Sequence, residues 1–332
     1  MSGRTRLAKA RVVRFGKFGG PEVLETAEVE VGEPRAGEAH VRHTAVGLNM
    51  IDVYHRTGLY PLSLPSGLGG EAAGVVVAVG EGVTHIAPGD RVAYAAPPPL
   101  GAYSTERVMD ARWLVKLPAA IADDTAAAIM LKGLTAWYLL HATYPVKRGE
   151  WIVLHAAAGG VGLLAAQWAR HLGARVIGIV GSEAKRPIAL AHGCEHVLLA
   201  TEDFAARVRE LTGGEGVPVV YDSVGKDTFT RSLDCLRRRG LLVSFGNSSG
   251  PVPPLSLLEL SKRGSLYVTR PTLCDFIRER EDLEAGSRAL FEVVASGAVR
   301  VEINQRYPLA EAAAAHRDLE ARKTTGSSVL LP

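Results

Sequence analysis

The sequence predicts an α/β protein in which a strand-rich region precedes a doubly wound parallel sheet. Residues up to about 120 hold short alternating runs, separated by Gly- and Pro-rich turns such as Pro88-Gly89-Asp90, and this pattern is typical of a small barrel. From about residue 124, short apolar runs alternate with helical segments, as they do in βαβ units. A chain of 332 residues exceeds one typical core and therefore indicates two domains.

Composition excludes several classes of protein. The chain is 47% apolar and 22% charged with a formal net charge of +3, which is ordinary for a globular protein and calls for neither nucleic acid nor an anionic membrane as a partner. No apolar run approaches the ~18–20 residues of a membrane span. Three scattered cysteines, Cys194, Cys235 and Cys274, form no metal or disulfide pattern. We expect buried thiols and a cytoplasmic location.

In the strand-rich region we expect strands near 11–15, 39–45, 73–79 and 91–95. Residues 1–10 are basic but lack the apolar stretch of a signal peptide. We interpret them as a short frayed extension, with an organellar transit peptide as the alternative.

The second region is predicted to alternate strands and helices to its end. The expected strands are 151–155, 174–180, 195–199, 217–221, 240–245 and 265–269. The expected helices are 126–131, 135–142, 162–172, 184–192, 203–211, 226–238 and 276–296. An Ala-rich helix at 310–321 and a terminal strand follow, and we expect this tail to return to the first domain.

The strand at 151–155 is followed by a small-residue turn and a helix. Aligned to the dinucleotide fingerprint GxGxxG, the turn has Ala157, Gly159 and Gly162 at the positions of the three glycines, so alanine replaces the first glycine. Small residues there allow a pyrophosphate to approach the backbone, and the helix N-terminus offers unpaired N–H groups. The alternative is a tight turn in another kind of α/β protein.

The end of the next strand bears on the choice between NADPH and NADH. An NAD enzyme usually has an acidic residue there to bind the ribose. Here the strand ends Val180-Gly181-Ser182, and Lys185 and Arg186 follow within one helical turn. Cations favour a 2′-phosphate, so the sequence favours NADPH. Glu183 is the opposing feature, and a solvated helix face is the alternative for the two cations.

A metal site is not predicted. Residues 1–150 contain no cysteine, and their histidines, His40, His43, His55, His85 and His141, make no HxxxH pair. We expect these histidines at the surface. Hydride transfer without a Lewis acid favours an electrophilic acceptor such as a quinone or a conjugated carbonyl.

Two further polar groups follow predicted secondary structure. Asp222 and Ser223 end a strand at the carboxyl edge of the sheet, where ligands collect; capping of the next helix is the alternative. The run Arg237 to Arg239 is interpreted as a solvated helix end.

Together with these features, a set of motifs resembles the quinone oxidoreductases of the zinc-free medium-chain dehydrogenase/reductase superfamily, the group that includes ζ-crystallin, and especially its bacterial NADPH-dependent members. The resemblance covers nearly the whole chain from Phe18. The motifs lie at 19–24, 49–54, 56–60, 65–74, 89–92, 132–135, 155–162, 221–225, 240–250 and 264–271.

The resemblance implies a GroES-like domain at 1–131, completed by the tail at about 300–332, and a Rossmann NADPH-binding domain at 132–299. It also implies a cleft between them and a homodimer. Asn49 stands where zinc-dependent relatives carry a cysteine, and Gly69-Gly70-Glu71 stands where they carry Gly-His-Glu.

The resemblance also implies a set of binding residues. Asn49, Tyr54 and Tyr60 would line the substrate pocket, and Tyr54 is a candidate proton donor. Those implied to contact the cofactor are Asn49, Met50, Asp52, Tyr54, Lys132, Thr135, Ala158, Gly159, Gly160, Val161, Gly162, Ser182, Lys185, Ser223, Phe245, Gly246, Asn247, Ser248, Val268, Thr269, Arg270 and Arg322. One departure is Ala200, where the bacterial pattern has a tyrosine near the adenosine phosphate.

The predicted function is NADPH-dependent reduction of quinones by metal-free hydride transfer. One alternative is reduction of the C=C bond of enones or 2-alkenals with the same cofactor. An alternative of another class is a non-catalytic, crystallin-like protein that binds NADPH or RNA.

Overall fold

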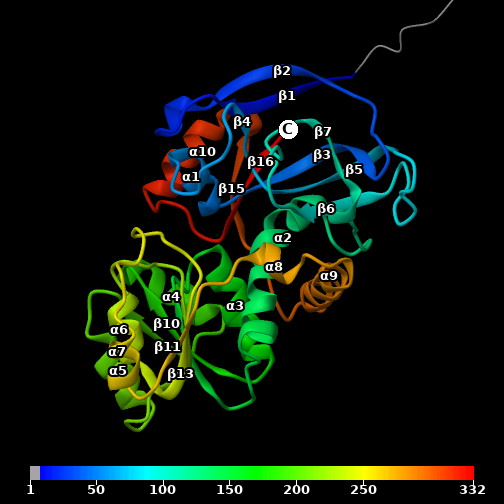
Figure 1. The fold of residues 1–332 in the computed structure, drawn as a ribbon. Helices are drawn as coiled ribbons and strands as arrows, with labels where there is room; N and C mark the ends of the chain where they lie inside the picture. Colours follow the sequence, from blue (N-terminus) through cyan, green and yellow to red (C-terminus); the bar gives the residue numbers. More distant parts are fainter. Residues whose placement is uncertain (1–7) are drawn as a thin grey trace, which may run out of the picture. The chain divides into compact units, whose positions relative to one another are not determined.

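The computed structural model describes residues 8–332, and the chain folds into two compact units (Figure 1). The first unit comprises residues up to Leu131 together with Glu279–Phe291 and Val301–Pro332, and the second comprises Lys132–Arg278 and Glu292–Arg300. Most of the N-terminal extension, residues 1–7, lies outside the described residues. No helix of the described part has the length and apolar character needed to span a membrane.

The first unit is built on two sheets. A seven-stranded sheet has the order β15-β16-β3-β5-β6-β8, with β7 paired to β3, and a three-stranded sheet has the order β2-β1-β4. The strands are β1 (Ala8–Phe15), β2 (Glu25–Val31), β3 (Glu38–Leu48), β4 (Ser66–Gly67), β5 (Glu71–Val79), β6 (Arg91–Ala95), β7 (Glu106–Asp110), β8 (Val115–Lys116), β15 (Ile303–Pro308) and β16 (Ser327–Leu331).

The C-terminal tail completes the larger sheet. Strand β16 runs antiparallel to β3, with Ser328 opposite Leu48, and β15 runs parallel to β16. Between them lie a short 3-10 turn (Leu309–Glu311) and α10 (Ala312–Glu320). The tail therefore packs beside the strand that leads directly into α1 (Met50–Thr57).

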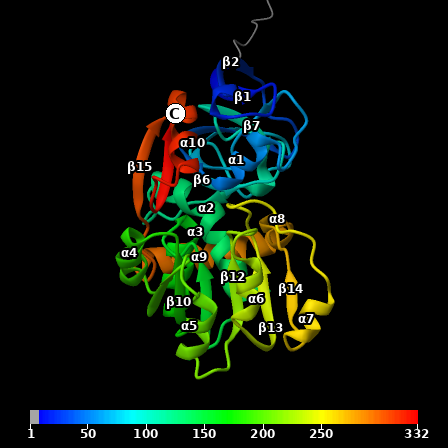
Figure 2. The same ribbon diagram turned by 90° about the vertical axis from the view of Figure 1, so that its left-hand side faces the viewer.

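The second unit is a six-stranded, all-parallel sheet of order β11-β10-β9-β12-β13-β14. This is the doubly wound order, so the predicted fold class is confirmed. In Figure 2 several of these strands run side by side, with β14 at the edge. The strands are β9 (Trp151–His155), β10 (Arg175–Val180), β11 (His196–Leu199), β12 (Val217–Asp222), β13 (Leu236–Ser244) and β14 (Tyr267–Thr269).

Crossover helices join these strands, and apolar side chains between helices and sheet form the core, including Phe204, Leu233 and Leu242. The crossover helices are α3 (Gly160–His171), α4 (Arg186–Ala191), α5 (Phe204–Leu211), α6 (Phe229–Asp234) and α7 (Leu258–Lys262), and a short helix, α8 (Leu273–Phe276), follows the last strand. A 3-10 turn at Glu183–Lys185 precedes α4.

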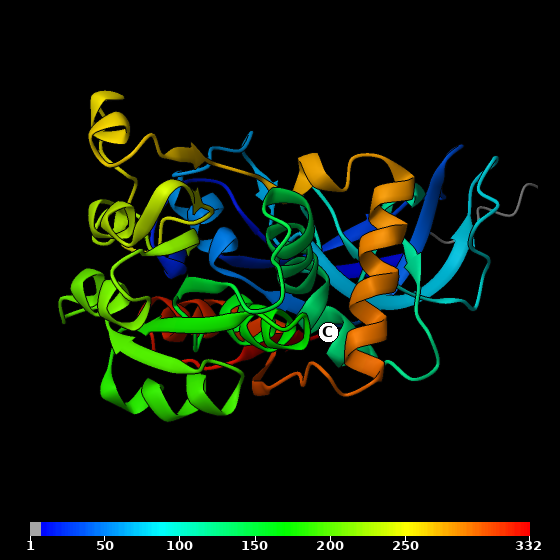
Figure 3. The same ribbon diagram turned by 90° about the horizontal axis from the view of Figure 1, so that it is seen from below.

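Several predicted helices differ from the structure. The pair at 126–131 and 135–142 is one helix, α2 (Asp123–Trp137), that continues as a π-helix over Tyr138–Thr143. The long helix expected at 276–296 is the short α8 followed by α9 (Arg280–Ala295), which Figure 3 shows as one continuous helix.

The segment 226–238 was predicted as one helix, but α6 ends at Asp234 and β13 already begins at Leu236. Arg237 to Arg239 therefore lie on a strand, and their interpretation as a helix end is wrong. Arg239 has a φ of 57°, in the left-handed region, so the strand is irregular there. Charged residues on a strand do not show the apolar alternation by which strands are recognised.

Candidate functional site

The segment 156–162, which comprises the turn after β9 and the first residues of α3, is called the glycine turn below. Helix α3 begins at Gly160, no side chain caps it, and its first turn carries no acidic residue. A Cβ atom added to Gly162 would overlap the carbonyl oxygen of Ala156 and lie 2.8 Å from Ala157 Cα. Only glycine lets the helix pack this closely, and the uncapped, positive helix N-terminus fits a pyrophosphate.

The end of β10 carries the residues expected at a 2′-phosphate. Ser182 is exposed and Lys185 is half-buried. Arg186 points elsewhere: its guanidinium donates to Glu183 at 2.9 Å and to Glu202 at 3.1 Å. Arg186 thus neutralises Glu183, and hydrogen bonding to Arg186 lowers the pKa of that carboxyl. The carboxylate that opposed an NADPH site is therefore already paired.

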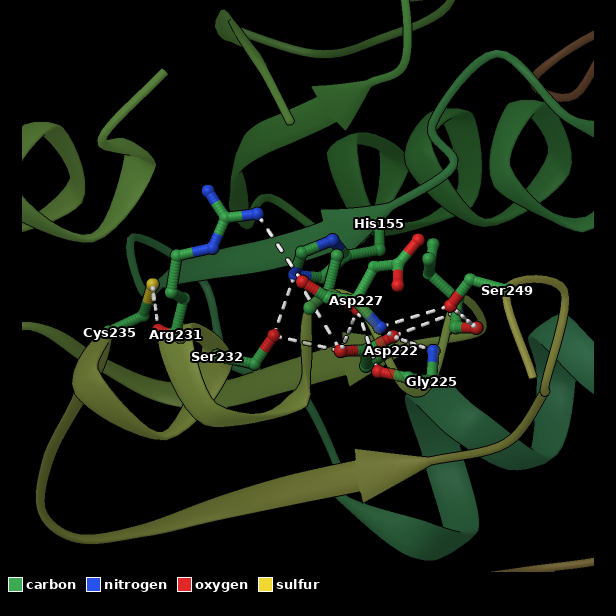
Figure 4. A network of polar contacts seen from close by, with 10 residues as sticks. His155, Asp222, Gly225, Asp227, Arg231, Ser232, Cys235 and Ser249 are labelled. Carbon is green, nitrogen blue, oxygen red and sulfur yellow. Dashed lines mark hydrogen bonds and ion pairs between the residues drawn. The ribbon is translucent and has the colours of Figure 1, made fainter. Parts of the chain in front are cut away.

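A buried network of hydrogen bonds joins the carboxyl ends of β9 and β12 to α6 (Figure 4). Ser232 of α6 bridges the last residues of two neighbouring strands: its Oγ lies 2.9 Å from His155 Nε2 and donates to Asp222 Oδ2 at 2.8 Å. Asp222 also accepts from the amides of Val224 and Gly225, at 2.8 and 3.1 Å. Burial lowers the pKa of His155, although the Asp222 charge opposes this.

Asp222 thus shapes the loop that leads into α6 but does not cap that helix, whose N-cap residue is Thr228 and which has no side-chain cap. Its carboxylate is fully buried, while the neighbouring Ser223 is half-buried. A Cβ atom on Gly246 would lie 2.9 Å from Ser223 Cα, so the loops after β12 and β13 are in close contact. The cofactor residues predicted after β13, Phe245, Gly246, Asn247 and Ser248, begin at this contact.

The remaining predicted residues of the second unit lie at its margins. Val268, Thr269 and Arg270 are on or just after the edge strand β14, and Val268 and Arg270 are exposed. Lys132 and Thr135 are buried on α2. Ala200 follows β11 and packs partly against the apolar core.

In the first unit, Asn49 caps the helix that carries Met50, Asp52 and Tyr54. Asn49 and Asp52 form a capping box: the side chain of each accepts a hydrogen bond from the backbone N–H of the other. The Asn49 amide N–H donates to Asp52 Oδ2 at 2.9 Å, and Asn49 Nδ2 donates to Glu71 Oε2 at 2.7 Å. Asn49, which stands where zinc-dependent relatives carry a cysteine, is therefore hydrogen-bonded to Glu71, the glutamate that directly follows Gly70.

The predicted substrate residues Tyr54 and Tyr60 lie together. Their ring centroids are 5.2 Å apart in an edge-to-face arrangement, and both side chains are half-buried. Arg322 is exposed after the end of α10, with a φ of 57°.

Four residues connected to this helix have no role predicted from the sequence: Arg56, Tyr103, His316 and Glu320. Arg56, Tyr103 and His316 are fully buried and hydrogen-bonded to one another or to Asp52. Arg56 and Glu320 are 264 positions apart in the chain. No local pattern reveals a pair so distant in sequence.

The expectation of surface histidines is wrong for three of them. His40, His43 and His55 are all buried, and burial lowers the pKa of His43 to about 4. Within residues 8–332, no three His, Cys, Asp or Glu side chains gather in a way that could hold a metal ion.

The cysteines are free thiols. Cys194 and Cys235 are buried as expected, and burial raises both pKa values to about 12. Cys274 is only half-buried.

Comparison with known proteins agrees with this geometry. Residues 35–119 match the alcohol dehydrogenase GroES-like domain, and residues 160–290 match the zinc-binding dehydrogenase family. The quinone oxidoreductase of Pseudomonas aeruginosa is 55% identical over 97% of this chain and 100% of its own length. The chain belongs to the quinone oxidoreductase family of medium-chain dehydrogenases. The resemblance inferred from the motifs is thereby confirmed.

The fold agrees equally well with solved structures of this family. The crystal structure of Escherichia coli quinone oxidoreductase complexed with NADPH has a TM-score of 0.95 and 52% identity, covering 98% of this chain and 100% of that one. A 2-haloacrylate reductase of a Burkholderia species is 48% identical over 95% of this chain and 97% of its own length.

Proposed function

We propose that this protein reduces quinones with NADPH. The observation that carries the proposal is the 55% identity to a quinone oxidoreductase along 97% of the chain. The glycine turn supports it independently, because its uncapped helix N-terminus and close backbone packing fit a dinucleotide.

The residues proposed to hold the cofactor are those that the family resemblance implies. When bound, NADPH supplies a hydride from its nicotinamide ring. The pyrophosphate would lie on Ala158, Gly159, Gly160, Val161 and Gly162, and the 2′-phosphate would lie near Ser182 and Lys185. Further contacts are proposed from Asn49, Met50, Asp52, Tyr54, Lys132, Thr135, Ser223, Phe245, Gly246, Asn247, Ser248, Val268, Thr269, Arg270 and Arg322.

Asn49, Tyr54 and Tyr60 are proposed to orient the acceptor. Asn49 is held in place by Asp52 and Glu71, and the Tyr54 and Tyr60 rings offer flat surfaces for a planar acceptor. The chain would thus contribute orientation and exclusion of water more than acid–base catalysis. Transfer without a metal stays a prediction, and so does Tyr54 as proton donor.

One experiment separates the candidate acceptors. Stopped-flow oxidation of NADPH should be fast with 1,4-benzoquinone and slow with 2-alkenals and 2-haloacrylate. The reverse order would favour a C=C reductase, the second candidate, which the 48% identity to a 2-haloacrylate reductase supports. Tight NADPH binding without turnover of any acceptor would indicate the non-catalytic alternative, for which salt-sensitive RNA binding is the further assay.

Homodimer formation is also proposed, through the edge of the parallel sheet. Among residues 8–332, strand β14 pairs with β13 alone, and its Tyr267 is 60% exposed. Leu257 and Leu258 are 77% and 67% exposed on the preceding segment. An open edge strand beside exposed apolar side chains is suited to pairing with a second copy. Light scattering should report a dimer for the native chain and a monomer for Tyr267→Asp.

A cytoplasmic location is proposed from the three free cysteines, which suit a reducing compartment. Cell fractionation would test it.

A further inference from the structure

A chain of hydrogen bonds connects α10 to the N-terminus of α1, and all of its residues except the exposed Glu320 are buried. Glu320 receives two bonds from the Arg56 guanidinium, at 2.9 and 2.7 Å. Arg56 also lies 3.1 Å from His316 Nδ1, and His316 Nε2 lies 3.1 Å from the Tyr103 hydroxyl. Tyr103 in turn donates to Asp52 Oδ2 at 3.1 Å. We call these five residues the buried polar chain.

The chemistry of the groups fixes the direction of every bond. Arg56 can only donate, so His316 Nδ1 must accept and the proton of the neutral ring must lie on Nε2. Nε2–H then donates to the Tyr103 oxygen, which leaves the Tyr103 hydroxyl proton for Asp52. Burial and the Arg56 charge lower the pKa of His316 to about 3, so the ring stays neutral. Along the path from Arg56 through His316 and Tyr103, each residue therefore donates to the next one in the direction of Asp52.

The backbone N–H of Asn49 lies at the end of this series of hydrogen bonds. Asp52 Oδ2 accepts from both Tyr103 and the Asn49 backbone N–H. Asn49, Asp52 and Arg56 share one face of α1, because they are spaced by three and four residues. His316 and Glu320 share one face of α10 for the same reason. Two helices distant in sequence are thus joined through side chains that end at Asn49.

We propose that Tyr103 and His316 are positioning residues. They act through the Asp52 carboxylate to hold Asn49 in the position needed for hydride transfer. The proposal rests on the proposed function for its catalytic consequence. Without the Tyr103 hydroxyl, Asp52 Oδ2 loses a hydrogen-bond donor, and His316 Nε2–H is left buried without the acceptor it has in the native protein. Both changes loosen the carboxylate that fixes Asn49.

The first unit contains a matched control. Tyr94 is also fully buried and also bonds a buried histidine, with 3.0 Å between its hydroxyl and His43 Nε2. His43 Nδ1 lies 2.8 Å from the carbonyl oxygen of Ser104, so this pair ends on backbone and not on Asp52. Tyr94→Phe removes a comparable buried hydroxyl without touching the buried polar chain.

The test compares Tyr103→Phe with Tyr94→Phe in two measurements. In steady-state assays with NADPH and 1,4-benzoquinone, Tyr103→Phe should lower kcat about tenfold while KM for NADPH stays within about twofold. Tyr94→Phe should leave kcat within about twofold of the native value. In hydrogen–deuterium exchange, Tyr103→Phe should speed exchange of the Asn49 amide, and Tyr94→Phe should not.

Substitutions at His316 give a second, independent comparison. Glutamine can accept from Arg56 with its oxygen and donate to Tyr103 with its nitrogen, whereas leucine can do neither. His316→Gln should therefore keep most of the native kcat and the slow Asn49 exchange, and His316→Leu should lose both. This pair also decides the question if Tyr103→Phe does not fold.

The two readouts separate the possible failures. If the native protein turns over no quinone, the proposed function is wrong, and amide exchange alone decides the positioning role. Unchanged Asn49 exchange in Tyr103→Phe and His316→Leu would overturn the inference whatever the activity. Equal losses of kcat in Tyr103→Phe and Tyr94→Phe would also overturn it, since they would mark a general effect on stability.

Discussion

The glycine turn of the second unit and helix α1 of the first both place polar groups for binding, but they are made differently. The turn offers backbone N–H groups of consecutive residues, and its close packing depends on a missing side chain at Gly162. The start of α1 offers the side chain of Asn49, held by Asp52, Glu71 and the buried polar chain that continues to Glu320. One site depends on local backbone shape and the other on long-range side-chain contacts.

This difference determines how each site fails. A backbone site tolerates many side chains around it but no extra atom at its closest contact. A side-chain network depends instead on each of its donors and acceptors, because the loss of one donor leaves a buried partner unsatisfied. The five predictions below separate these two kinds of failure.

The largest effect is expected at the glycine turn. Gly162→Ala adds a Cβ atom that overlaps the Ala156 carbonyl oxygen, so the turn must move. NADPH affinity should fall about 100-fold, because overpacking strain is on the order of 3 kcal/mol. Fluorescence titration with NADPH measures it. Gly181→Ala is the control, since nothing lies within 4 Å of its added Cβ; an equal loss there would contradict the packing argument.

Removing the buried cation should cost the most stability. Arg56 is fully buried and bonded to Glu320, His316 and the Gly19 carbonyl. Arg56→Met should lower the free energy of unfolding by about 3–5 kcal/mol, because it leaves these partners unpaired. Urea denaturation measures the loss. In the exposed Arg278–Asp275 pair, Arg278→Met should change stability by less than about 1 kcal/mol. Similar losses in the two variants would refute the role of burial.

Acid should act on the side-chain site through His316. Its pKa falls from 6.5 to about 3 on folding, through burial and the Arg56 charge. Below pH 6.5 the unfolded chain binds a proton that the folded chain does not, so stability is lost as pH falls toward 3. The loss is about 1.4 kcal/mol per pH unit. Urea denaturation at pH 5.5 and 4.5 measures how the free energy of unfolding depends on pH. This dependence should be weaker by that amount in His316→Gln than in the native protein, and it should be unchanged in exposed His171→Gln.

The contrast between the sites also explains what could be predicted from sequence. The glycine turn, β9 and α3 were predictable because strand, small residues and helix lie within about 20 consecutive positions. The buried polar chain was not, because Tyr103 and His316 are 213 positions apart and buried histidines have no local signature. The pairing of Arg186 with Glu183 also needed the structure, since adjacent charges in a sequence do not show which way their side chains point.

A smaller effect is expected at the 2′-phosphate. Lys185→Ala should raise KM for NADPH about tenfold and leave KM for NADH nearly unchanged, because only NADPH carries the phosphate charge. Steady-state kinetics with both cofactors measure the ratio. The matched control is Lys147→Ala, an exposed lysine that precedes the amino-terminal end of β9, whereas Lys185 follows the carboxyl end of the neighbouring parallel strand β10. Equal changes in KM for NADPH and NADH would refute NADPH selection by Lys185.

The smallest effect is expected at Tyr54. Its ring lies edge-to-face with Tyr60 at 5.2 Å, and Phe at either position keeps that contact. If the Tyr54 hydroxyl protonates the reduced acceptor, Tyr54→Phe should lower kcat about threefold, because water can partly replace the donor. Tyr60→Phe should not change kcat. A native rate for Tyr54→Phe would show that the hydroxyl takes no part in the reaction and that only the ring contacts the acceptor. The side chains of α1 would then contribute to catalysis only by orienting the reactants.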